Sequence, residues 1–598
     1  MDNVSLFRKW MKRRGTAAFI FPSNDPHYGE YVPDHWKSRE WISGFNGSAG
    51  TAVVTMEDAA LWTDSRYFLA AEEQLKGTPF RLMKEKLPGT PTIAEWLGQV
   101  LPEGSKVGID HSLFSISAWR RLRKELEKQN LELAFYDDPM DEVWYDRPEL
   151  PKAPVEIQPL EFAGETTRSK IDRVRKALTE LQVYGIFISK LDDIAWLTNL
   201  RGTDVHCCPL FVSYMLITSD EAILYIDLDK LTPEVKSYLK EQGIRAESYF
   251  IASTGLTGYL WKSILLDPDC TDCEVQWIMP KGTMVLEHES FIPAMKAIKN
   301  EAEIRGYRSA MHKDGVAMVR FLRWLKSGEW TRDNGQWRMN GETVTELSID
   351  RKLTSLRTEQ PLFRDLSFDT ISAYGAHGAV VHYEPTPETD IPLEPRGLLL
   401  LDSGAQYQDG TTDITRTISL GPLTDEEKTD YTLVLKGHIR LAMAKFPVGA
   451  SGTQLDALAR YAMWQHGINF LHGTGHGVGS YLNVHEGPHQ IRMNYMPAPL
   501  VAGMTVTNEP GIYKAGKHGC RTENTMLITH CCDGEFGEFL QFEPLTLCPI
   551  DTAPIRMDMM ANDEREWLNN YHKHVYEELA PLLEEEEREW LREATHPI

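Results

Sequence analysis

Apolar residues in the first half of the chain alternate between short runs and longer amphipathic stretches. Segments such as 19–23 and 186–190 are separated by stretches such as 116–129 and 231–242, in which apolar positions recur at helical spacing. Short apolar runs favour strands, whereas apolar positions at i, i+3 and i+4 favour helices. Their alternation predicts α/β architecture in this half of the chain.

One pattern of this half occurs twice. FIFPS at 19–23 and LWTD at 61–64 correspond, in the same order and with a Trp-containing turn between them, to IFISK at 186–190 and LYID at 224–227. Repetition of such a unit indicates a shared architecture. The stretch 147–159 between the copies carries four prolines among charged residues and is predicted to be a linker.

The pattern changes near residue 297. Helical spacing over 300–325 and 341–357 is followed by strand-like and helical segments in an order that does not repeat a βαβ unit. The strand-like segments are 397–407, 410–420 and 504–513, and the helical ones are 426–446, 453–467 and 563–593. This part is predicted to be α+β with a largely antiparallel sheet.

These patterns predict three domains. The boundaries are 1–155, 156–296 and 297–598, and the third domain ends in a helical extension. A chain of 598 residues is long enough for several hydrophobic cores.

Composition excludes several classes of protein. The net charge of -24 argues against nonspecific binding of nucleic acid, because such binding depends on neutralisation of phosphates by Lys and Arg. No stretch is apolar enough to span a bilayer or to serve as a secretory signal, so we expect a cytoplasmic protein. Eight cysteines are too sparse for a disulfide scaffold.

Four carboxylates stand where strands end or begin. Asp402 closes an apolar strand-like run, and Asp413 follows after an Asp-Gly turn signal, so a hairpin could place both on neighbouring strands. Glu509 and Glu523 flank a second turn-forming stretch in the same manner. A lone Asp or Glu at such a position is usually a cap residue or half of an ion pair.

The four carboxylates together predict a metal site. Acidic groups aimed into one core repel each other and lose hydration unless cations neutralise them. His476, in the glycine-rich segment HGTGHGVG, offers an imidazole nitrogen. A ligand set of carboxylate oxygens with one imidazole is more typical of Mn²⁺ than of structural zinc, which prefers thiolates and several imidazoles. Two such ions could activate a water and polarise a carbonyl.

Ordered motifs along essentially the whole chain carry a family resemblance. They are SGFNGSAGTAVV, LWTDSRYF, DIAWLTNLRG, VVHYEPTPET, LDSGAQYQDGTTDITRT, HGTGHGVGSYLNVHEGP and NEPGIY with RTEN. With these motifs the sequence resembles the pita-bread metallopeptidases, and within them the large, cytosolic, three-domain Xaa-Pro aminopeptidases (aminopeptidase P). The resemblance implies two creatinase-N-like α/β domains followed by a pita-bread catalytic domain.

The resemblance also implies a set of metal ligands. These are Asp402, Asp413, His476, Glu509 and Glu523, with Asp413 and Glu523 bridging two divalent ions. Mn²⁺ is the expected metal, with Zn²⁺ or Co²⁺ as alternatives. The implied reaction releases the N-terminal residue from peptides with proline in second position, by attack of a metal-bridging hydroxide. A homodimer is implied by the family alone.

Further residues take roles from the same resemblance. His382, His472 and His485 are expected to line the substrate site, and Glu509 is expected to relay a proton to the leaving prolyl nitrogen. Arg521 would steady a ligand carboxylate. Arg66 in TDSRYF resembles an arginine that reaches the substrate region.

Three other readings stay open at this point. A prolidase, which cuts Xaa-Pro dipeptides, shares the ligand set, although the duplicated first half favours the aminopeptidase. A creatinase-like amidinohydrolase would work without this ligand set. A non-catalytic peptide-binding relative would be expected to lose ligands. Cys520, close to the proposed metals, raises the possibility of sensitivity to oxidation.

Overall fold

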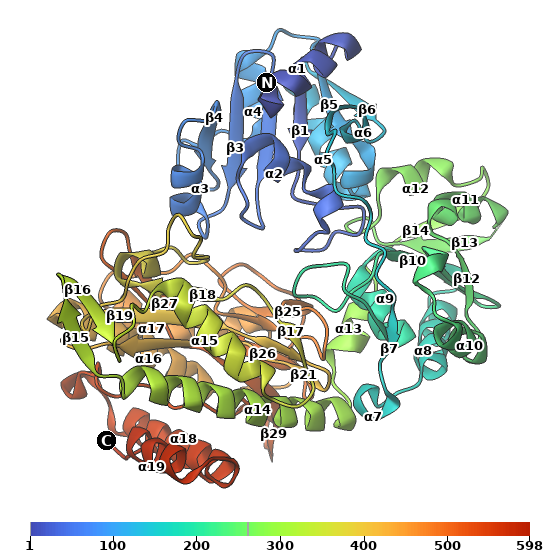
Figure 1. Cartoon of the computed structure of the whole chain (residues 1–598). Coiled ribbons are helices and arrows are strands. Elements are labelled where there is room, and N and C mark those ends of the chain that lie inside the picture. The colour runs from blue at the N-terminus through green and yellow to red at the C-terminus, as the bar shows by residue number, and fades with distance from the viewer. Residues whose placement is uncertain (1, 260–261) are drawn as a thin grey trace. The chain divides into compact units, whose positions relative to one another are not determined.

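Two six-stranded sheets with the same strand connectivity make up the first part of the chain. The computed structural model describes residues 2–259 and 262–598, which divide into two units (Figure 1). The first unit comprises Met1–Pro159 and Glu165–Ile292, and the second comprises Leu160–Gly164 and Pro293–Ile598. Our division into three domains stays a prediction.

The first sheet has the strand order β4-β3-β2-β1-β5-β6, and the second has the order β12-β11-β10-β8-β13-β14. The strands of the first sheet are β1 Ala18–Phe21, β2 Thr51–Thr55, β3 Ala59–Thr63, β4 Phe80–Lys84, β5 Lys106–Asp110 and β6 Glu132–Tyr136. Those of the second sheet are β8 Gly185–Ile188, β10 Ser213–Thr218, β11 Ala222–Ile226, β12 Arg245–Ser248, β13 Ser263–Leu266 and β14 Met284–Glu287.

The pairing directions of the two sheets are also identical. In both sheets the first strand pairs antiparallel with the second and parallel with the fifth, and the third and fourth strands run parallel. The repeated pattern of strands therefore predicted a real structural duplication. The prediction of two related α/β domains ahead of an α+β part is confirmed in this respect.

Helices of the first unit follow the amphipathic pattern of the sequence. They include α5 Ile116–Glu127, α8 Thr167–Glu180 and α10 Pro233–Gln242. The hydroxyl of Ser115 accepts a hydrogen bond from the N–H of Ala118 and so caps the start of α5. Trp119, Leu122 and Leu126 of the same helix are buried in a core of the first sheet.

The second unit contains antiparallel strands enclosed by helices. One sheet has the order β18-β19-β22, and another has the order β23-β30-β29-β26. These strands are β18 Ile371–Tyr374, β19 Leu398–Ser403, β22 Ile414–Ser419, β23 Lys445–Pro447, β26 Thr505–Asn508, β29 Asn524–Gly534 and β30 Gly537–Pro544. All their pairings are antiparallel, as the sequence predicted.

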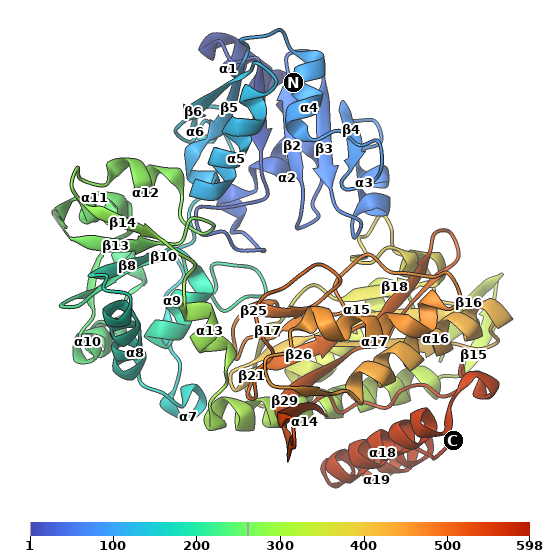
Figure 2. The ribbon, with the colours of Figure 1, turned by 180° about the vertical axis from the view of Figure 1, so that it is seen from behind.

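Long helices cover the sheets of the second unit. Helices α16 Asp425–Ala442 and α17 Gly452–Trp464 lie side by side, as the view from behind shows (Figure 2). Helix α14 Glu301–Lys326 packs against α15 Glu346–Thr358. The closing helices α18 Asn562–Leu579 and α19 Glu585–Ala594 pack along α14 (Figure 1).

Helix α15 begins later than the sequence pattern predicted. Helical spacing started at residue 341, but the first helical residue is Glu346. Gly341 has a φ of 84°, and Thr345 caps the helix by accepting the N–H of Ser348. The left-handed glycine and the cap hold residues 341–345 outside the helix.

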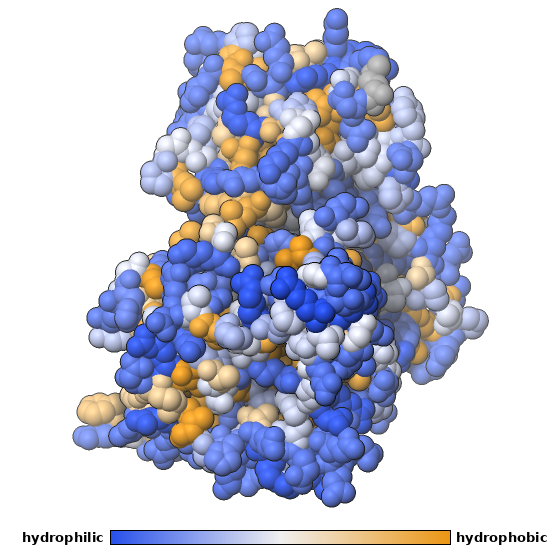
Figure 3. Space-filling model, turned by 60° about the vertical axis from the view of Figure 1, so that its left-hand side comes forward, coloured by the Kyte–Doolittle hydropathy of each residue, from blue (hydrophilic) through white to orange (hydrophobic). Residues whose placement is uncertain are grey.

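The surface agrees with the hydrophilic character that the charged residues give the composition. The face drawn in Figure 3 is mostly hydrophilic, with apolar residues in small groups. Among the described residues, no helix combines the length and the apolar character needed to cross a bilayer.

Candidate metal centre

The first pair of carboxylates lies on the predicted hairpin. Asp402 is in β19 and pairs with Thr415 of β22, while Asp413 stands immediately before β22. Between them, β20 Ala405–Tyr407 and β21 Gly410–Thr411 close the Asp-Gly turn. The strand pairing therefore brings two carboxylates, eleven residues apart in sequence, to the same end of one sheet.

The second pair is held by a strand pair with a smaller hairpin inserted. Glu509 directly follows β26, and Glu523 directly precedes β29, whose residue Asn524 is paired with Asn508. The inserted hairpin consists of β27 Gly511–Lys514 and β28 His518–Arg521.

Thr415 joins the two carboxylate pairs. Its hydroxyl donates a hydrogen bond to Oε2 of Glu523 at 2.7 Å, and its carbonyl accepts the N–H of Glu523 at 3.1 Å. Both residues are buried. The hairpin of Asp402 and Asp413 is thus fixed to the one that carries Glu523.

His476 turns its Nε2 atom toward two of these carboxylates. Its Nδ1 lies 2.9 Å from the carbonyl of Gly477, which can only accept, so Nδ1 carries a proton and Nε2 is the atom that could bind a metal ion. Nε2 lies 3.4 Å from Asp413 and 3.5 Å from Glu509. A β-carbon at Gly475 would stand 1.9 Å from the carbonyl oxygen of Thr507, so only glycine permits this approach.

The ligand atoms are close enough to share ions. Asp413, His476 and Glu523 each offer one ligand atom within 4.8 Å of the other two. Burial alone would lower the pKa of His476, but its hydrogen bond with Asp413 and the charge of Glu509 raise that pKa to about 9. Without a cation, the negative charge of the site therefore draws a proton onto the imidazole.

The carboxylates themselves are unfavourable without a cation. Burial raises the pKa of Glu523 well above its ordinary value, and Asp413 and Glu509 add to the shift. Burial raises the pKa of Glu509 to about 7 against the opposing charges of His476 and Arg521. Burial also raises the pKa of Asp402, whose Oδ1 is buried without a hydrogen-bond partner among the described residues. These residues fit a site for divalent metal, which would supply the missing positive charge.

Arg521 links the carboxylates to a histidine through a tyrosine. Its Nη2 donates to Oδ2 of Asp402 at 2.6 Å, and its Nη1 donates to the hydroxyl of Tyr513 at 2.7 Å. Nδ1 of His472 donates to the carbonyl of Gly473 at 2.7 Å, so Nε2 of His472 accepts the Tyr513 hydroxyl at 2.8 Å. The imidazole of His472 is therefore held in one tautomer.

Sequence reasoning missed Tyr513. The residue stands in the motif NEPGIY, four residues after Glu509, and its place in β27 looked like that of an ordinary strand residue. The motif was the available signal, but the hydrogen bonds to Arg521 and His472 depend on tertiary structure.

The remaining predicted site residues lie in three places. The ring of His485 is perpendicular to that of His476, with 4.2 Å between their centroids. His382 follows Val381, whose carbonyl accepts a hydrogen bond from Nη2 of Arg521 at 3.3 Å. Arg66 belongs to the first unit, where its guanidinium contacts Asp64 and Glu30.

Two residues near the site differ in surroundings from what their sequence context indicated. His489, which follows the motif NVHEGP, is buried, and its Nε2 donates to the carbonyl of Thr505 at 2.7 Å. Cys520 is buried in β28, and burial raises the pKa of its thiol well above the ordinary value. Because the thiolate is the reactive form, this burial disfavours oxidation of Cys520.

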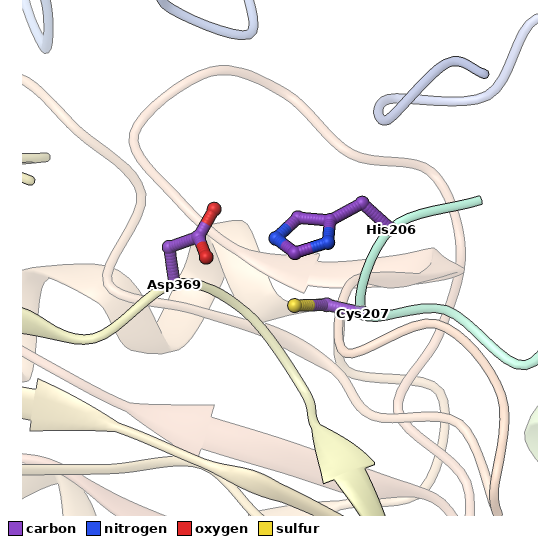
Figure 4. A group of neighbouring side chains, drawn as sticks. All are labelled: His206, Cys207 and Asp369. Carbon is purple, nitrogen blue, oxygen red and sulfur yellow. The ribbon is translucent and has the colours of Figure 1, made fainter. Parts of the chain in front are cut away.

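A second group of side chains of metal-binding types consists of His206, Cys207 and Asp369 (Figure 4). His206 and Cys207 are neighbours in one loop of the first unit, and Asp369 precedes β18 in the second unit (Figure 4). Because these residues come from different units, no metal site is assigned to them.

Four family models match the chain. Residues 305–530 match the metallopeptidase family M24, and residues 538–598 match the C-terminal region of peptidase M24. Residues 4–142 and 146–303 each match the creatinase/prolidase N-terminal domain. The two α/β sheets and the metal-ligand cluster thus fall within separate family matches.

Relatives of similar length match along the whole chain. Aminopeptidase P1 of Arabidopsis thaliana is 39% identical, over 97% of this chain and 96% of the relative. A probable Xaa-Pro aminopeptidase P of Aspergillus niger is 40% identical, over 100% of this chain and 98% of the relative.

Solved structures give the same comparison in three dimensions. An X-prolyl aminopeptidase from Caenorhabditis elegans, described as a cytosolic enzyme with a di-nuclear active site, matches with a TM-score of 0.92 and 36% identity. The match covers 98% of this chain and 95% of that one. A prolidase from Pyrococcus horikoshii matches with a TM-score of 0.50 and 25% identity, over only 64% of this chain.

Proposed function

This chain belongs to the Xaa-Pro aminopeptidases of metallopeptidase family M24, and we propose that it releases the N-terminal residue from peptides whose second residue is proline. The observation that carries this function is the gathering of the carboxylates of Asp413, Glu509 and Glu523 around His476, in a chain that matches aminopeptidase P relatives from end to end. The same matches support a metal-dependent hydrolase.

Five residues are proposed to hold two divalent ions: Asp402, Asp413, His476, Glu509 and Glu523, with Asp413 and Glu523 shared between the ions. When bound, the ions supply Lewis acidity, which polarises the scissile carbonyl and strengthens water as a nucleophile near neutral pH. Mn²⁺ is the proposed metal because the donor set is oxygen-rich with a single imidazole, and Zn²⁺ and Co²⁺ are the alternatives.

The protein's own residues are proposed to bind the peptide and to move a proton. His472 is fixed by Tyr513 and Gly473, and its Nδ1 lies 4.0 Å from Oε2 of Glu509, so it is available with His382 and His485 to orient the peptide. Glu509 would carry a proton to the prolyl nitrogen as the bond breaks.

Proline in the second position removes a common recognition element. The scissile Xaa-Pro bond is a tertiary amide without an N–H, so the site cannot hold the substrate through that donor. The pocket histidines and, as proposed from the family resemblance, Arg66 would take over this task. The three-domain division at 1–155, 156–296 and 297–598 is proposed to separate the two α/β domains from the catalytic one.

A homodimer in the cytoplasm is the proposed state. Helix α17 exposes Leu458, Tyr461 and Trp464, and neighbouring loops expose Leu471, Met493 and Tyr495. We name these six residues the α17 patch. Apolar patches of this kind on a protein surface commonly mark interfaces, and a second copy is the partner that the family favours. The cytosolic location of the Caenorhabditis elegans relative supports the proposed compartment.

The test compares an Xaa-Pro-Yaa tripeptide with the matching Xaa-Pro dipeptide, using metal-stripped protein with and without added Mn²⁺. Mn²⁺-dependent release of the first residue from the tripeptide alone supports the aminopeptidase. Preference for the dipeptide would favour a prolidase. Absence of turnover on both peptides at full metal loading would favour a peptide-binding protein without activity.

A further inference from the structure

A buried ion pair on α17 faces the loop that carries His472. Asp456 and Arg460 are one helical turn apart, and Nε of Arg460 donates to Oδ2 of Asp456 at 2.6 Å. Both side chains are almost completely buried, with 3% and 1% of their surface exposed. An Asp and an Arg four residues apart on a helix usually form an exposed pair of small energetic value, so this burial needs another reason.

The guanidinium of Arg460 is saturated by the loop at 469–474. Besides Nε, its two terminal nitrogens donate to the side chain of Asn469, the carbonyls of Phe470 and His472, and the hydroxyl of Thr474. The plane of the guanidinium also lies over the ring of Phe470, 3.7 Å from its centroid. All five N–H groups therefore have acceptors, and four of these acceptors belong to one short loop.

Asp456 contacts the same loop with its second oxygen. The hydroxyl of Thr474 donates to Oδ1 of Asp456 at 2.6 Å. The carbonyl of Thr474 in turn accepts the N–H of Glu509 at 2.8 Å. The loop is thus held on one side by the ion pair of α17 and on the other by the segment that carries Glu509.

We propose that Arg460 is a positioning residue, which acts through His472 by fixing the 469–474 loop for the proposed hydrolysis of Xaa-Pro bonds. This inference rests on the proposed function of the site. Arg460 touches neither the carboxylate cluster nor the imidazole of His472, but it holds the backbone carbonyl of His472 at 2.9 Å. A shift of this carbonyl would move the imidazole away from Tyr513 and change its place in the proposed peptide site.

Arginine is required here for its shape as well as its charge. The planar fork presents five donors at fixed angles, whereas a lysine presents three donors on a flexible stem. Lysine could keep the ion pair with Asp456 but could not reach both the Phe470 and the His472 carbonyls. The conservative change Arg460→Lys is therefore expected to restore part of the activity and not all of it.

The experiment measures kcat and KM for an Xaa-Pro-Yaa tripeptide at saturating Mn²⁺ in Arg460→Met and Arg460→Lys. We expect Arg460→Met to lose about 100-fold in kcat/KM, as small misplacements of binding groups do, with a rise in KM. Loss of folded molecules alone would lower the maximal rate and leave KM unchanged. Amide hydrogen exchange should accelerate in the segment 469–474 of the variant.

The matched control is Arg440→Met. Arg440 lies on the neighbouring helix α16 and pairs with Asp563 and Glu564, at 2.6 and 2.9 Å, without a contact to the 469–474 loop among the described residues. We expect its kcat/KM to stay within about threefold of the unaltered protein. An equal loss in both variants would overturn the proposal.

A double substitution tests whether Arg460 acts through His472. In the background of His472→Gln, Arg460→Met should reduce kcat/KM by less than about threefold, because residues that act as a unit are not additive. A full additional loss would refute action through His472. If Arg460→Met does not fold, Thr474→Val removes only the hydroxyl that joins the loop to Asp456, and unchanged KM and exchange in that variant would also refute the proposal.

These results separate two kinds of failure. If the unaltered protein does not cleave the tripeptide with Mn²⁺, the proposed function fails. If it does cleave the tripeptide and the Arg460 variants behave like Arg440→Met, only the positioning role fails.

Discussion

Arg521 donates a hydrogen bond from Nη2 to Oδ2 of Asp402 across 2.6 Å, and both side chains are buried. The contact leaves the other oxygen of Asp402 without a hydrogen-bond partner among the described residues. An arginine that occupies one carboxylate oxygen sets the direction of the other, which is then available to a metal ion.

Loss of this orienting contact should weaken metal binding. Replacing Arg521 by Met removes the counter-charge of Asp402 and the hydrogen bond that fixes its rotamer. We expect the affinity for Mn²⁺ to fall about 10–100-fold, the usual cost of removing a partner of a ligand. Titration of metal-stripped protein by calorimetry measures this directly, with Arg440→Met as the control. Unchanged affinity in Arg521→Met would contradict the orienting role.

Loss of the Tyr513 hydroxyl should reduce turnover of the peptide more than it reduces binding of the metal. Tyr513→Phe keeps the ring between Arg521 and His472 but removes the hydroxyl that holds Nε2 of His472. We expect kcat/KM for the tripeptide to fall about tenfold, in the range for one lost buried hydrogen bond, with little change in the concentration of Mn²⁺ needed for activity. A metal requirement that changes as much as kcat/KM would place Tyr513 with the ligands instead.

Local patterns predicted the strand pairs but not the contacts between loops. The Asp-Gly turn before Asp413 fixed a short-range hairpin, and apolar runs on both sides gave its strands. The shared α/β architecture of the two copies was predicted for the same reason, since each copy repeats one local pattern. Such features depend on residues close together in sequence.

The roles of Arg460 and Tyr513 could not be predicted from any local sequence pattern, because their contacts depend on tertiary structure. At i+4 from Asp456, Arg460 looks like half of a surface ion pair on a helix. Its contacts with the carbonyls of Phe470 and His472 arise only because α17 packs against the loop that follows it. Backbone carbonyls carry no sequence signal, so arginines that hold a loop through carbonyls escape prediction.

The α17 patch makes a prediction about assembly. Tyr461 has 62% of its surface exposed and lies on the same helix as the exposed Leu458 and Trp464. If the patch is the interface of a homodimer, Tyr461→Glu buries two charges in it and should yield monomers. Sedimentation velocity measures the mass, and Tyr145→Glu, at an exposed tyrosine of the first unit, is the control. A dimer that persists in Tyr461→Glu would exclude this surface.

The final prediction concerns pH and His572 of α18. The N–H of Ile550 donates to Nε2 of His572 at 3.1 Å, and the imidazole is fully buried. Burial, together with the charge of Arg416, lowers the pKa of His572 from 6.5 to about 4. Protonation would break this hydrogen bond and place a charge beside the buried Arg416. The folded protein therefore holds His572 neutral.

The sign of the effect on stability follows from this lowered pKa. Between about pH 6.5 and 4 the unfolded chain binds the proton and the folded chain does not, so acidification favours unfolding. The stability that His572 contributes is complete above pH 6.5 and is lost as the pH falls toward 4. At 1.36 kcal/mol for each unit of pKa, the loss at pH 5 is about 2 kcal/mol.

His572→Gln isolates this contribution, because the side-chain oxygen of Gln accepts the N–H of Ile550 but does not titrate. We expect denaturant unfolding of metal-free protein to show a smaller loss of free energy of unfolding from pH 7.5 to pH 5 in the variant, by about 2 kcal/mol. Buried His438, whose pKa is about 3, keeps its own acid sensitivity in both proteins. His574→Gln, at an exposed position of the same helix, is the matched control. If the free energy of unfolding depends on pH in the same way in His572→Gln and in the unaltered protein, the buried imidazole of His572 is not a source of acid sensitivity.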